Sequence, residues 1–246
     1  MRTGRYFAAG LVALMVLAAC APGPGGERTP DAEPDPEPLT ERTEALIADP
    51  DVPVILAFGD SLTNGHQVER SMAYPAQLQR LLDAGGYPYQ VVNYGNDGDT
   101  TSNGVARLAG ALAYDPEIVI LEFGGNDGLR GIPIDVASEN LSTMIAAFKD
   151  GGARVVLAGL TLPRNYGPEY IASFENMYVD LAASHNVGLI PFFLEGLVDL
   201  EALDTPGTDL SDAVRHMQSD GTHPTGEGYT IVARTVFDAI TPHLER

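Results

Sequence analysis

The sequence predicts an α/β protein, with a single three-layer α/β/α domain built around a five-stranded parallel sheet. Two observations carry this prediction. From Val52 onward, short apolar runs alternate with longer amphipathic segments, and this alternation is typical of a sheet covered by helices on both faces. The apolar runs are also nearly continuous, as expected for strands that are buried on both faces.

Each predicted element follows from its own stretch of the pattern. The five apolar runs predict strands at residues 54–58, 90–93, 118–123, 154–160 and 188–191. The amphipathic segments predict helices at residues 74–83, 103–113, 137–149, 170–185 and 227–243. Ligands of open α/β sheets bind at the carboxyl ends of the strands. The loops that follow the strands are therefore where a functional site is expected.

The composition is that of a globular protein with a strong excess of acid. Fourteen Lys and Arg stand against 34 Asp and Glu among 246 residues, which gives a formal charge of −20. Nucleic acids and anionic lipid head groups are repelled by such a charge. The sequence therefore argues against a nucleic-acid partner, and against direct binding of the folded domain to a membrane surface.

Residues 1–19 are expected to form a lipoprotein-type signal peptide. Arg2 and Arg5 precede an apolar stretch at residues 7–21, which is shorter than the roughly 20 residues of a membrane-spanning helix. The tetrad at residues 17–20, LAAC, resembles a lipobox, in which cleavage leaves Cys20 to carry acyl chains. Ordinary signal cleavage next to Cys20 is the alternative. Because Cys20 is the only cysteine, we favour an exported lipoprotein, periplasmic or in the cell envelope, that a lipid on Cys20 anchors to the membrane.

Residues 20–51 are expected to be a disordered tether, and residues 52–246 the folded domain. The tether is rich in proline, glycine and acids, without apolar periodicity, so it cannot bury enough surface to fold. The domain itself contains no cysteine, which excludes disulfides and a cysteine nucleophile within it.

Four short polar segments follow predicted strands or precede the last predicted helix. They are Gly59-Asp60-Ser61-Leu62, residues 93–100 (NYGNDGDT), Gly124-Gly125-Asn126-Asp127 and Asp220-Gly221-Thr222-His223-Pro224. Each segment alone is typical of a turn. Together, they provide the groups that serine-based acyl transfer requires.

Serine attack on an acyl group needs a base, a carboxylate that orients the base, and donors for the oxyanion. We assign Ser61 as the nucleophile, His223 as the base and Asp220 as its carboxylate partner. The expected oxyanion donors are the backbone N–H of Ser61, the backbone N–H of Gly98 and the side-chain amide of Asn126.

Other polar residues near these segments have simpler explanations. Asp60 is expected to cap the segment that follows it, and Asp127 to hold the loop of Asn126 in shape. His66 is an outside alternative for the base, although its loop shows no obvious carboxylate partner. No pair of histidines has the H-E-x-x-H spacing of a zinc hydrolase, so no catalytic metal is expected.

At these residues the chain resembles the GDSL, or SGNH, hydrolase family. Ser61, Gly98, Asn126 and His223 match the four letters of the second name, and the resemblance covers residues 54–244. It is closest to the bacterial thioesterase I, arylesterase and lysophospholipase group, whose signatures appear as LEFGGNDGLRG, NDGDTTSNGVARL, LPRNYG and PFFLEG. The resemblance implies a flavodoxin-like fold, a metal-free Ser-His-Asp mechanism without a cofactor, and action on acyl esters or thioesters.

Substrate choice stays open at the level of sequence. Four residues after the third and fourth strands are expected to line an acyl-chain groove: Leu129, Ile132, Leu162 and Tyr166. Residues 201–217 look longer than a minimal family member needs, so they could cap the cleft. The alternatives to a carboxylic esterase, thioesterase or lysophospholipase are a carbohydrate O-deacetylase and a non-catalytic lipid- or glycan-binding lipoprotein. A monomer is expected.

Overall fold

The computed structural model of this protein describes residues 51–197 and 215–246. The predicted signal peptide, Cys20, nearly all of the tether and most of residues 201–217 lie outside these described residues. Among the described residues, no helix is long and apolar enough to cross a membrane.

A five-stranded sheet forms the middle layer, and all of its strands run parallel. The strand order is β2-β1-β3-β4-β5, which is the order of flavodoxin-like folds. The predicted fold class is therefore confirmed. The strands are β1 (Val54–Gly59), β2 (Gln90–Gly95), β3 (Ile118–Glu122), β4 (Arg154–Ala158) and β5 (Gly188–Ile190).

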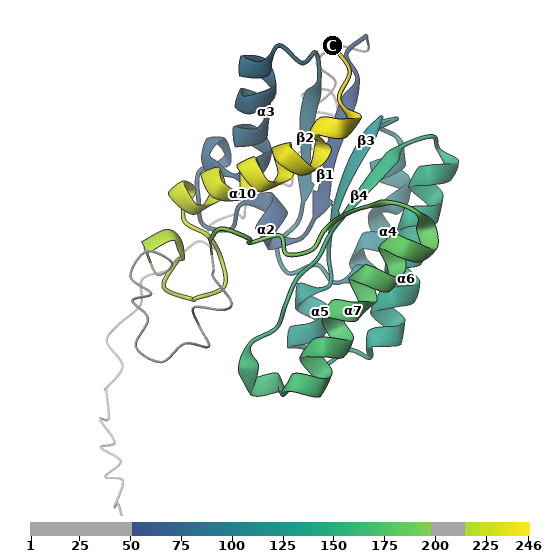
Figure 1. Cartoon of the computed structure of the whole chain (residues 1–246), viewed down its shortest axis with the longest axis vertical. Helices are drawn as coiled ribbons and strands as arrows, with labels where there is room; N and C mark the ends of the chain where they lie inside the picture. The colour runs from purple at the N-terminus through teal and green to yellow at the C-terminus, as the bar shows by residue number, and fades with distance from the viewer. Residues whose placement is uncertain (1–50, 198–214) are drawn as a thin grey trace, which may run out of the picture. The chain divides into compact units, whose positions relative to one another are not determined.

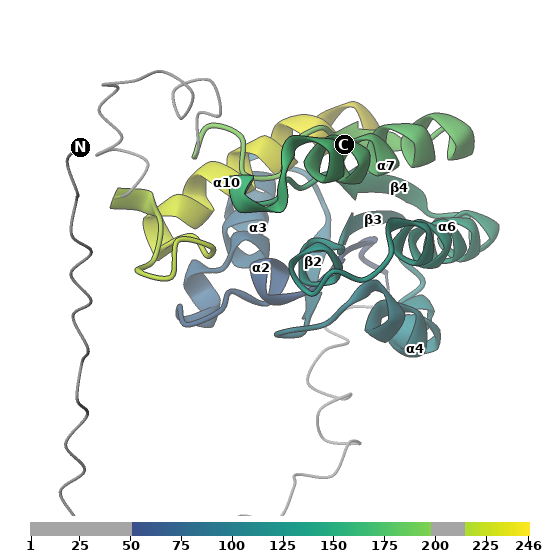
Figure 2. The ribbon, with the colours of Figure 1, turned by 90° about the horizontal axis from the view of Figure 1, so that it is seen from below.

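Helices cover both faces of this sheet (Figures 1 and 2). One layer holds α3 (Tyr74–Gly85) and α10 (Gly226–Ile240), which pack against each other. The other holds α4 (Thr101–Leu112), α6 (Ile134–Asp150) and α7 (Pro168–His185), with α6 between its two neighbours. All five predicted helices are present.

The helix boundaries differ from the predicted ones by a few residues, and at the start of α4 the reason is a capping box. The hydroxyl of Thr100 accepts from the Asn103 N–H, and the Asn103 side chain accepts from the Thr100 N–H. This capping box starts α4 at Thr101, two residues before the apolar pattern alone indicates. The last predicted helix instead ends at Ile240, and a 3₁₀ turn, Thr241–His243, follows it.

Between residues 51 and 197, two short α-helices were not predicted, and both follow strands at the carboxyl edge of the sheet. They are α2 (Ser61–Asn64), directly after β1, and α5 (Gly125–Leu129), directly after β3. Both are too short to show a helical apolar period. They matter because each carries one of the expected site residues.

Candidate active site

The nucleophile candidate stands where β1 turns into α2. Gly59 ends β1, and a Cβ at that position would lie 2.1 Å from the Thr63 Oγ1 atom, so only glycine allows this tight turn. Asp60 is the N-cap of α2, and its Oδ1 atom accepts from the Leu62 N–H at 3.0 Å, which confirms the expected capping role. Ser61 is therefore the first residue of a helix whose amino end faces the carboxyl edge of the sheet.

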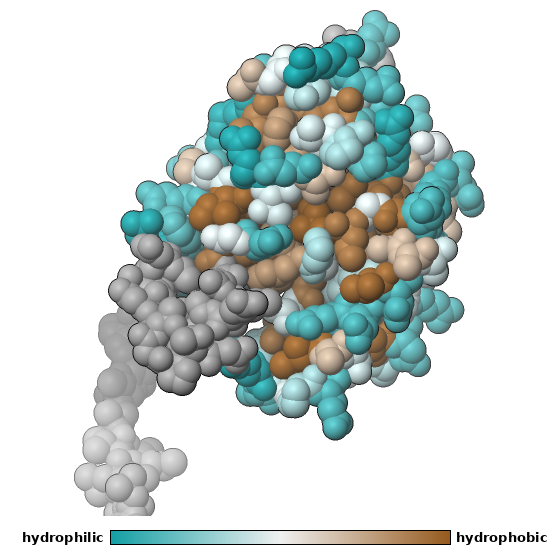
Figure 3. Space-filling view, in the orientation of Figure 1, coloured by the Kyte–Doolittle hydropathy of each residue, from teal (hydrophilic) through white to brown (hydrophobic). Residues whose placement is uncertain are grey.

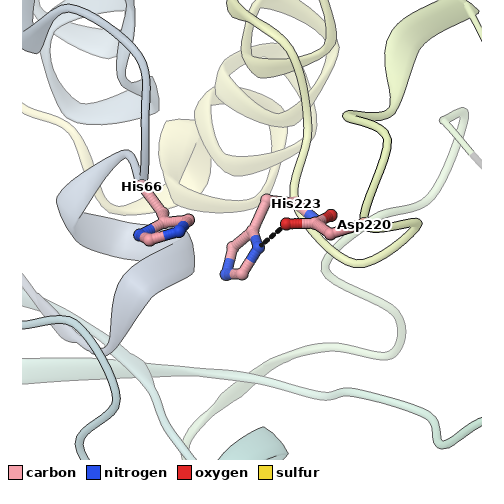
Figure 4. Close-up of side chains that lie close together, drawn as sticks. All are labelled: His66, Asp220 and His223. Carbon is pink, nitrogen blue, oxygen red and sulfur yellow. Dashed lines mark hydrogen bonds and ion pairs between the residues drawn. The ribbon is translucent and has the colours of Figure 1, made fainter. Parts of the chain in front are cut away.

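The base candidate lies on a closed loop before α10. An isolated antiparallel bridge joins Met217 to Pro224, and the Gln218 N–H donates to the His223 carbonyl at 2.8 Å. Within this loop, the imidazole Nδ1 atom of His223 lies 2.7 Å from the Asp220 Oδ2 atom (Figure 4). The other carboxylate oxygen accepts from the backbone N–H groups of Thr222 and His223, at 2.8 and 3.0 Å.

These contacts keep the Asp220 carboxylate ionised. Partial burial alone would raise its pKa, but the backbone N–H groups of His223 and Thr222 and the neighbouring imidazole outweigh burial. Together they lower the pKa of Asp220 to about 2. An ionised carboxylate on Nδ1 favours a proton at that nitrogen, and so leaves a lone pair on Nε2.

The structure brings the distant segments together. The His223 Nε2 atom lies 2.9 Å from the Ser61 Oγ atom, although 162 residues separate them in sequence. Ser61, His223 and Asp220 thus form one hydrogen-bonded series, and the imidazole side chain is only 15% exposed. The geometry has the spacing that proton transfer from the serine hydroxyl requires.

The three expected oxyanion donors differ in their present partners. Among the described residues, neither the Ser61 N–H nor the Gly98 N–H donates to a protein acceptor. Gly98 has a φ of +78°, which favours glycine, and its carbonyl accepts from the Arg130 guanidinium at 2.9 Å. The Asn126 amide is fully engaged, since its Nδ2 atom donates to the Asp60 Oδ2 atom and to the Asp99 carbonyl, both at 3.0 Å.

Beneath these donors lies a pair of buried carboxyl groups that the sequence analysis did not anticipate. Glu122 is fully buried at the end of β3, and Asp60 is 2% exposed. The Glu122 Oε2 atom accepts from the Thr63 hydroxyl at 2.8 Å and from the Asp60 N–H at 3.4 Å. Burial raises the pKa of Asp60 to about 6. Burial and the charge of Asp60 together raise the pKa of Glu122 well above its usual range.

The raised pKa values of both groups favour retention of a proton by this pair of carboxyls. Two neighbouring carboxyl groups in a buried site strongly disfavour ionisation of both at once. The ionised Asp60 is then free to accept from Asn126, so the pair fixes the orientation of that amide. A glutamate within an otherwise apolar strand, IVILE, is the sequence signal from which this pair could have been predicted.

Replacing Glu122 by glutamine is expected to remove a pH dependence of stability. The unfolded chain releases this proton above about pH 4.5, whereas the folded protein keeps it, so wild-type stability falls as pH rises. The free energy of unfolding of the variant should therefore increase relative to that of wild type as the pH rises from 5 to 8. Urea unfolding at pH 5, 6.5 and 8 measures this difference, and parallel curves for the two proteins would contradict the shared proton.

His66 has a carboxylate partner after all. Its Nδ1 atom lies 2.5 Å from the Asp97 Oδ2 atom, so the partner comes from a different loop, and the sequence alone did not predict this contact. Asp97 belongs to the loop after β2, and no local spacing in the sequence links it to His66. Because the Ser61 hydroxyl is bonded to His223 instead, His66 does not occupy the position of the base.

The four residues of the expected groove differ in how much of each is exposed to solvent. Leu129, at the end of α5, is 39% exposed, whereas Leu162 is only 5% exposed. A Cβ added at Gly128 would lie 2.6 Å from the Leu162 side chain, so Leu162 packs closely against α5 and exposes little surface. Tyr166 is partly exposed, and its hydroxyl donates to the Leu129 carbonyl at 2.7 Å. Ile132 is also partly exposed.

Two further residues hold the loops of the site in place. Asp127 accepts from the Thr101 N–H at 2.9 Å and from its hydroxyl at 2.6 Å, which confirms the expected role of Asp127 in shaping its loop. The Arg107 guanidinium bonds to Asp99 at 2.7 Å and to the carbonyls of Tyr94 and Gly59. Arg107 thus ties the ends of β1 and β2 together, a role that the sequence analysis missed.

A doubly wound sheet with serine, histidine and aspartate joined at the carboxyl ends of its strands defines the class of protein as a hydrolase. Residues 57–231 match the GDSL-like Lipase/Acylhydrolase family, and the chain belongs to this family. The esterase TesA of Pseudomonas aeruginosa is 37% identical over 77% of this chain and 89% of its own. An arylesterase of Vibrio mimicus is 38% identical over the same shares of the two chains. A crystal structure of TesA matches with a TM-score of 0.68 and 37% identity, covering 77% of this chain and 98% of that structure.

Proposed function

We propose that this protein is a serine esterase that hydrolyses carboxylic esters through an acyl-enzyme intermediate. The observation that carries the proposal is the series from Ser61 Oγ to His223 Nε2, at 2.9 Å, and from His223 Nδ1 to Asp220, at 2.7 Å. Family membership and the names of the relatives support the same reaction.

In the acylation step, His223 takes the hydroxyl proton as the Ser61 Oγ atom attacks the ester carbonyl. Asp220 stabilises the imidazolium that forms and holds the ring in the tautomer that can accept this proton. The tetrahedral intermediate then collapses, and His223 returns the proton to the leaving alkoxide or phenoxide. In the second step, the same histidine activates a water that attacks the acyl-enzyme, and Ser61 is released.

The oxyanion is stabilised by N–H donors that converge on the carboxyl edge of the sheet. The N–H groups of Ser61 and Gly98 are available without rearrangement. The Asn126 amide must exchange its bond to the Asp99 carbonyl for one to the oxyanion. The exchange is favourable because a hydrogen bond to a charged acceptor is about twice as strong as one to a neutral carbonyl.

Replacing Asn126 by alanine is expected to lower kcat by about 10²–10³-fold, the usual effect of losing one oxyanion donor. KM should change little, because this interaction strengthens in the transition state and not in the ground-state complex. Steady-state kinetics with p-nitrophenyl butyrate measure both constants. A variant that keeps wild-type kcat while folding normally would refute the role of Asn126.

The substrate class is esters with an apolar acyl chain. Leu129, Ile132 and Tyr166 offer partly exposed apolar surface on and after the segments that carry the oxyanion donors. Hydrophobic residues also reach the surface around α5 and α7 (Figure 3). A chain lying against this surface would be buried with a gain of about 0.8 kcal/mol per methylene. Acyl-thioesters and lysophospholipids present such a chain, and so do aryl esters of longer acids.

Replacing Leu129 by alanine is expected to reduce the preference for longer acyl chains. The ratio of kcat/KM for the octanoate ester to that for the acetate ester should fall about fourfold, the equivalent of roughly one buried methylene. The acetate ester serves as the internal control, because it is too short to reach the side chain. A ratio equal to that of wild type would place the acyl chain elsewhere.

A substrate series tests the proposed function itself. Wild-type protein and Ser61→Ala are assayed on three kinds of substrate. These are p-nitrophenyl esters of increasing chain length, the matching acyl-CoA thioesters and an acetylated sugar. Ester hydrolysis that depends on Ser61 is the expected result. Hydrolysis of the acetylated sugar alone would establish an O-deacetylase. Equal rates for wild type and Ser61→Ala on every substrate would exclude a serine hydrolase.

We also propose that the protein is exported and anchored to the cell envelope through a lipid on Cys20. The charged amino end, the short apolar stretch and the LAAC tetrad support this proposal. Mass spectrometry of the mature amino terminus should find an acylated Cys20. A mature chain in which Cys20 is unmodified, or from which Cys20 has been removed, would contradict the proposed lipid anchor.

A further inference from the structure

A second imidazole lies against the base of the proposed triad. The rings of His66 and His223 have centroids 4.5 Å apart and are tilted by 41°. In Figure 4, His66 comes from the segment after α2, whereas His223 and Asp220 come from the loop before α10. His66, His223 and Asp220 each offer one ligand atom, and these three atoms lie within 4.8 Å of one another.

The surroundings hold His66 as they would hold a metal ligand. Its Nδ1 atom is bonded to the Asp97 carboxylate, which directs the remaining lone pair to Nε2. Histidines that bind metals commonly have their other ring nitrogen on a carboxylate in this way.

The two segments are also fixed relative to each other. The Gln218 side-chain amide donates to the His66 carbonyl at 2.8 Å and to the Pro224 carbonyl at 2.9 Å. The three side chains remain accessible to solvent, with exposures of 29% for His66, 15% for His223 and 39% for Asp220. An ion can therefore reach the cluster without unfolding the loop.

We propose that His66, His223 and Asp220 form a binding site for a divalent transition metal such as Zn²⁺, and that metal binding switches the esterase off. Two imidazoles and one carboxylate are a ligand set that Zn²⁺ prefers, and a water completes its tetrahedral coordination. Mg²⁺ and Ca²⁺ prefer oxygen ligands, so they should bind poorly here. The formal charge of −20 draws cations to the protein.

Metal binding stops catalysis at either ring nitrogen of His223. A metal on Nε2 occupies the lone pair that would accept the Ser61 proton. A metal on Nδ1 displaces the proton from that nitrogen and leaves the neutral ring protonated at Nε2, which can then no longer act as a base. This inhibition rests on the proposed function, whereas the site itself does not.

Two measurements on the full chain test the site and its effect separately. Isothermal titration calorimetry with ZnCl₂ counts bound ions in wild type, His66→Phe and Asp97→Asn. Phenylalanine keeps a ring against His223 but offers no ligand, and asparagine removes the charge behind His66. Hydrolysis of p-nitrophenyl butyrate is then followed against Zn²⁺ concentration, with each rate expressed relative to the same variant without metal, and with Mg²⁺ as the control ion.

Wild type should bind one more Zn²⁺ equivalent than His66→Phe and should be inhibited reversibly. Half-inhibition should need about 10–100-fold more Zn²⁺ in Asp97→Asn and at least as large an increase in His66→Phe. Equal binding in wild type and His66→Phe would overturn the site, even if the protein proved to have no esterase activity. If His66→Phe bound one Zn²⁺ fewer than wild type but was inhibited at the same Zn²⁺ concentration, the proposed switch would be overturned.

Discussion

Replacing Ser61 by alanine is expected to lower kcat for p-nitrophenyl butyrate by at least about 10⁴-fold, because the residual rate would come only from the oxyanion donors and from substrate binding. The hydroxyl is removed from the first turn of α2, where its role is chemical. The Asp60 cap and the Leu62 N–H bond remain. The thermal unfolding midpoint should therefore change little.

The same loss is expected for His223→Ala, and the double variant should be no worse than either single one. Ser61 and His223 act as a unit, so removing the second after the first has no further effect on the chemical step. Kinetics of the three variants under identical conditions test this. If the two single losses multiplied in the double variant, the residues would act independently and the proposed relay would be wrong.

Replacing Asp220 by asparagine is expected to lower kcat by about 10⁴-fold at neutral pH. The asparagine carbonyl can still accept from the Thr222 and His223 N–H groups, so the loop should keep its shape. Its amide would face His223 Nδ1 with a donor, and the ring proton would then move to Nε2. The imidazole would present a proton to Ser61 in place of a lone pair.

The same substitution of aspartate by asparagine, made away from the site, separates the loss of kcat in Asp220→Asn from the mere loss of one negative charge. Asp150 is an exposed carboxylate at the end of α6, and Asp150→Asn should keep nearly the full rate. Far-UV circular dichroism and thermal melting should show both variants folded. A folded Asp220→Asn protein with wild-type kcat would mean that another group orients the imidazole.

The fold could be predicted from the sequence because its signals are local. A continuous apolar run such as ILAF in β1 indicates a strand buried on both faces, and amphipathic segments between such runs indicate the covering helices. The loops of Ser61, Gly98 and Asn126 follow parallel strands, so they could be predicted to lie together at the carboxyl edge of the sheet. The boundaries were less accurate because they depend on caps, such as the Thr100 and Asn103 pair at the start of α4.

The parts of the site that were missed depend on contacts between distant segments. His66 and Asp97 lie in loops after different strands, and only the parallel pairing of β1 with β2 brings those loops together. Glu122 meets Asp60 for the same reason, across β1 and β3. The sequence predicted Asn126 as a donor, but not that both of its N–H groups already have acceptors, since this depends on side-chain placement.

The central claim is that Ser61 is a nucleophile activated by His223, and covalent labelling tests it most directly. The protein is treated with an organophosphate aryl ester, which phosphorylates activated serines, and is then digested and examined by mass spectrometry. A single adduct on Ser61, formed as activity is lost and absent from the His223→Ala variant, is the predicted result. An adduct on another residue that accompanies the loss of activity, or equal labelling of Ser61 without His223, would contradict the claim.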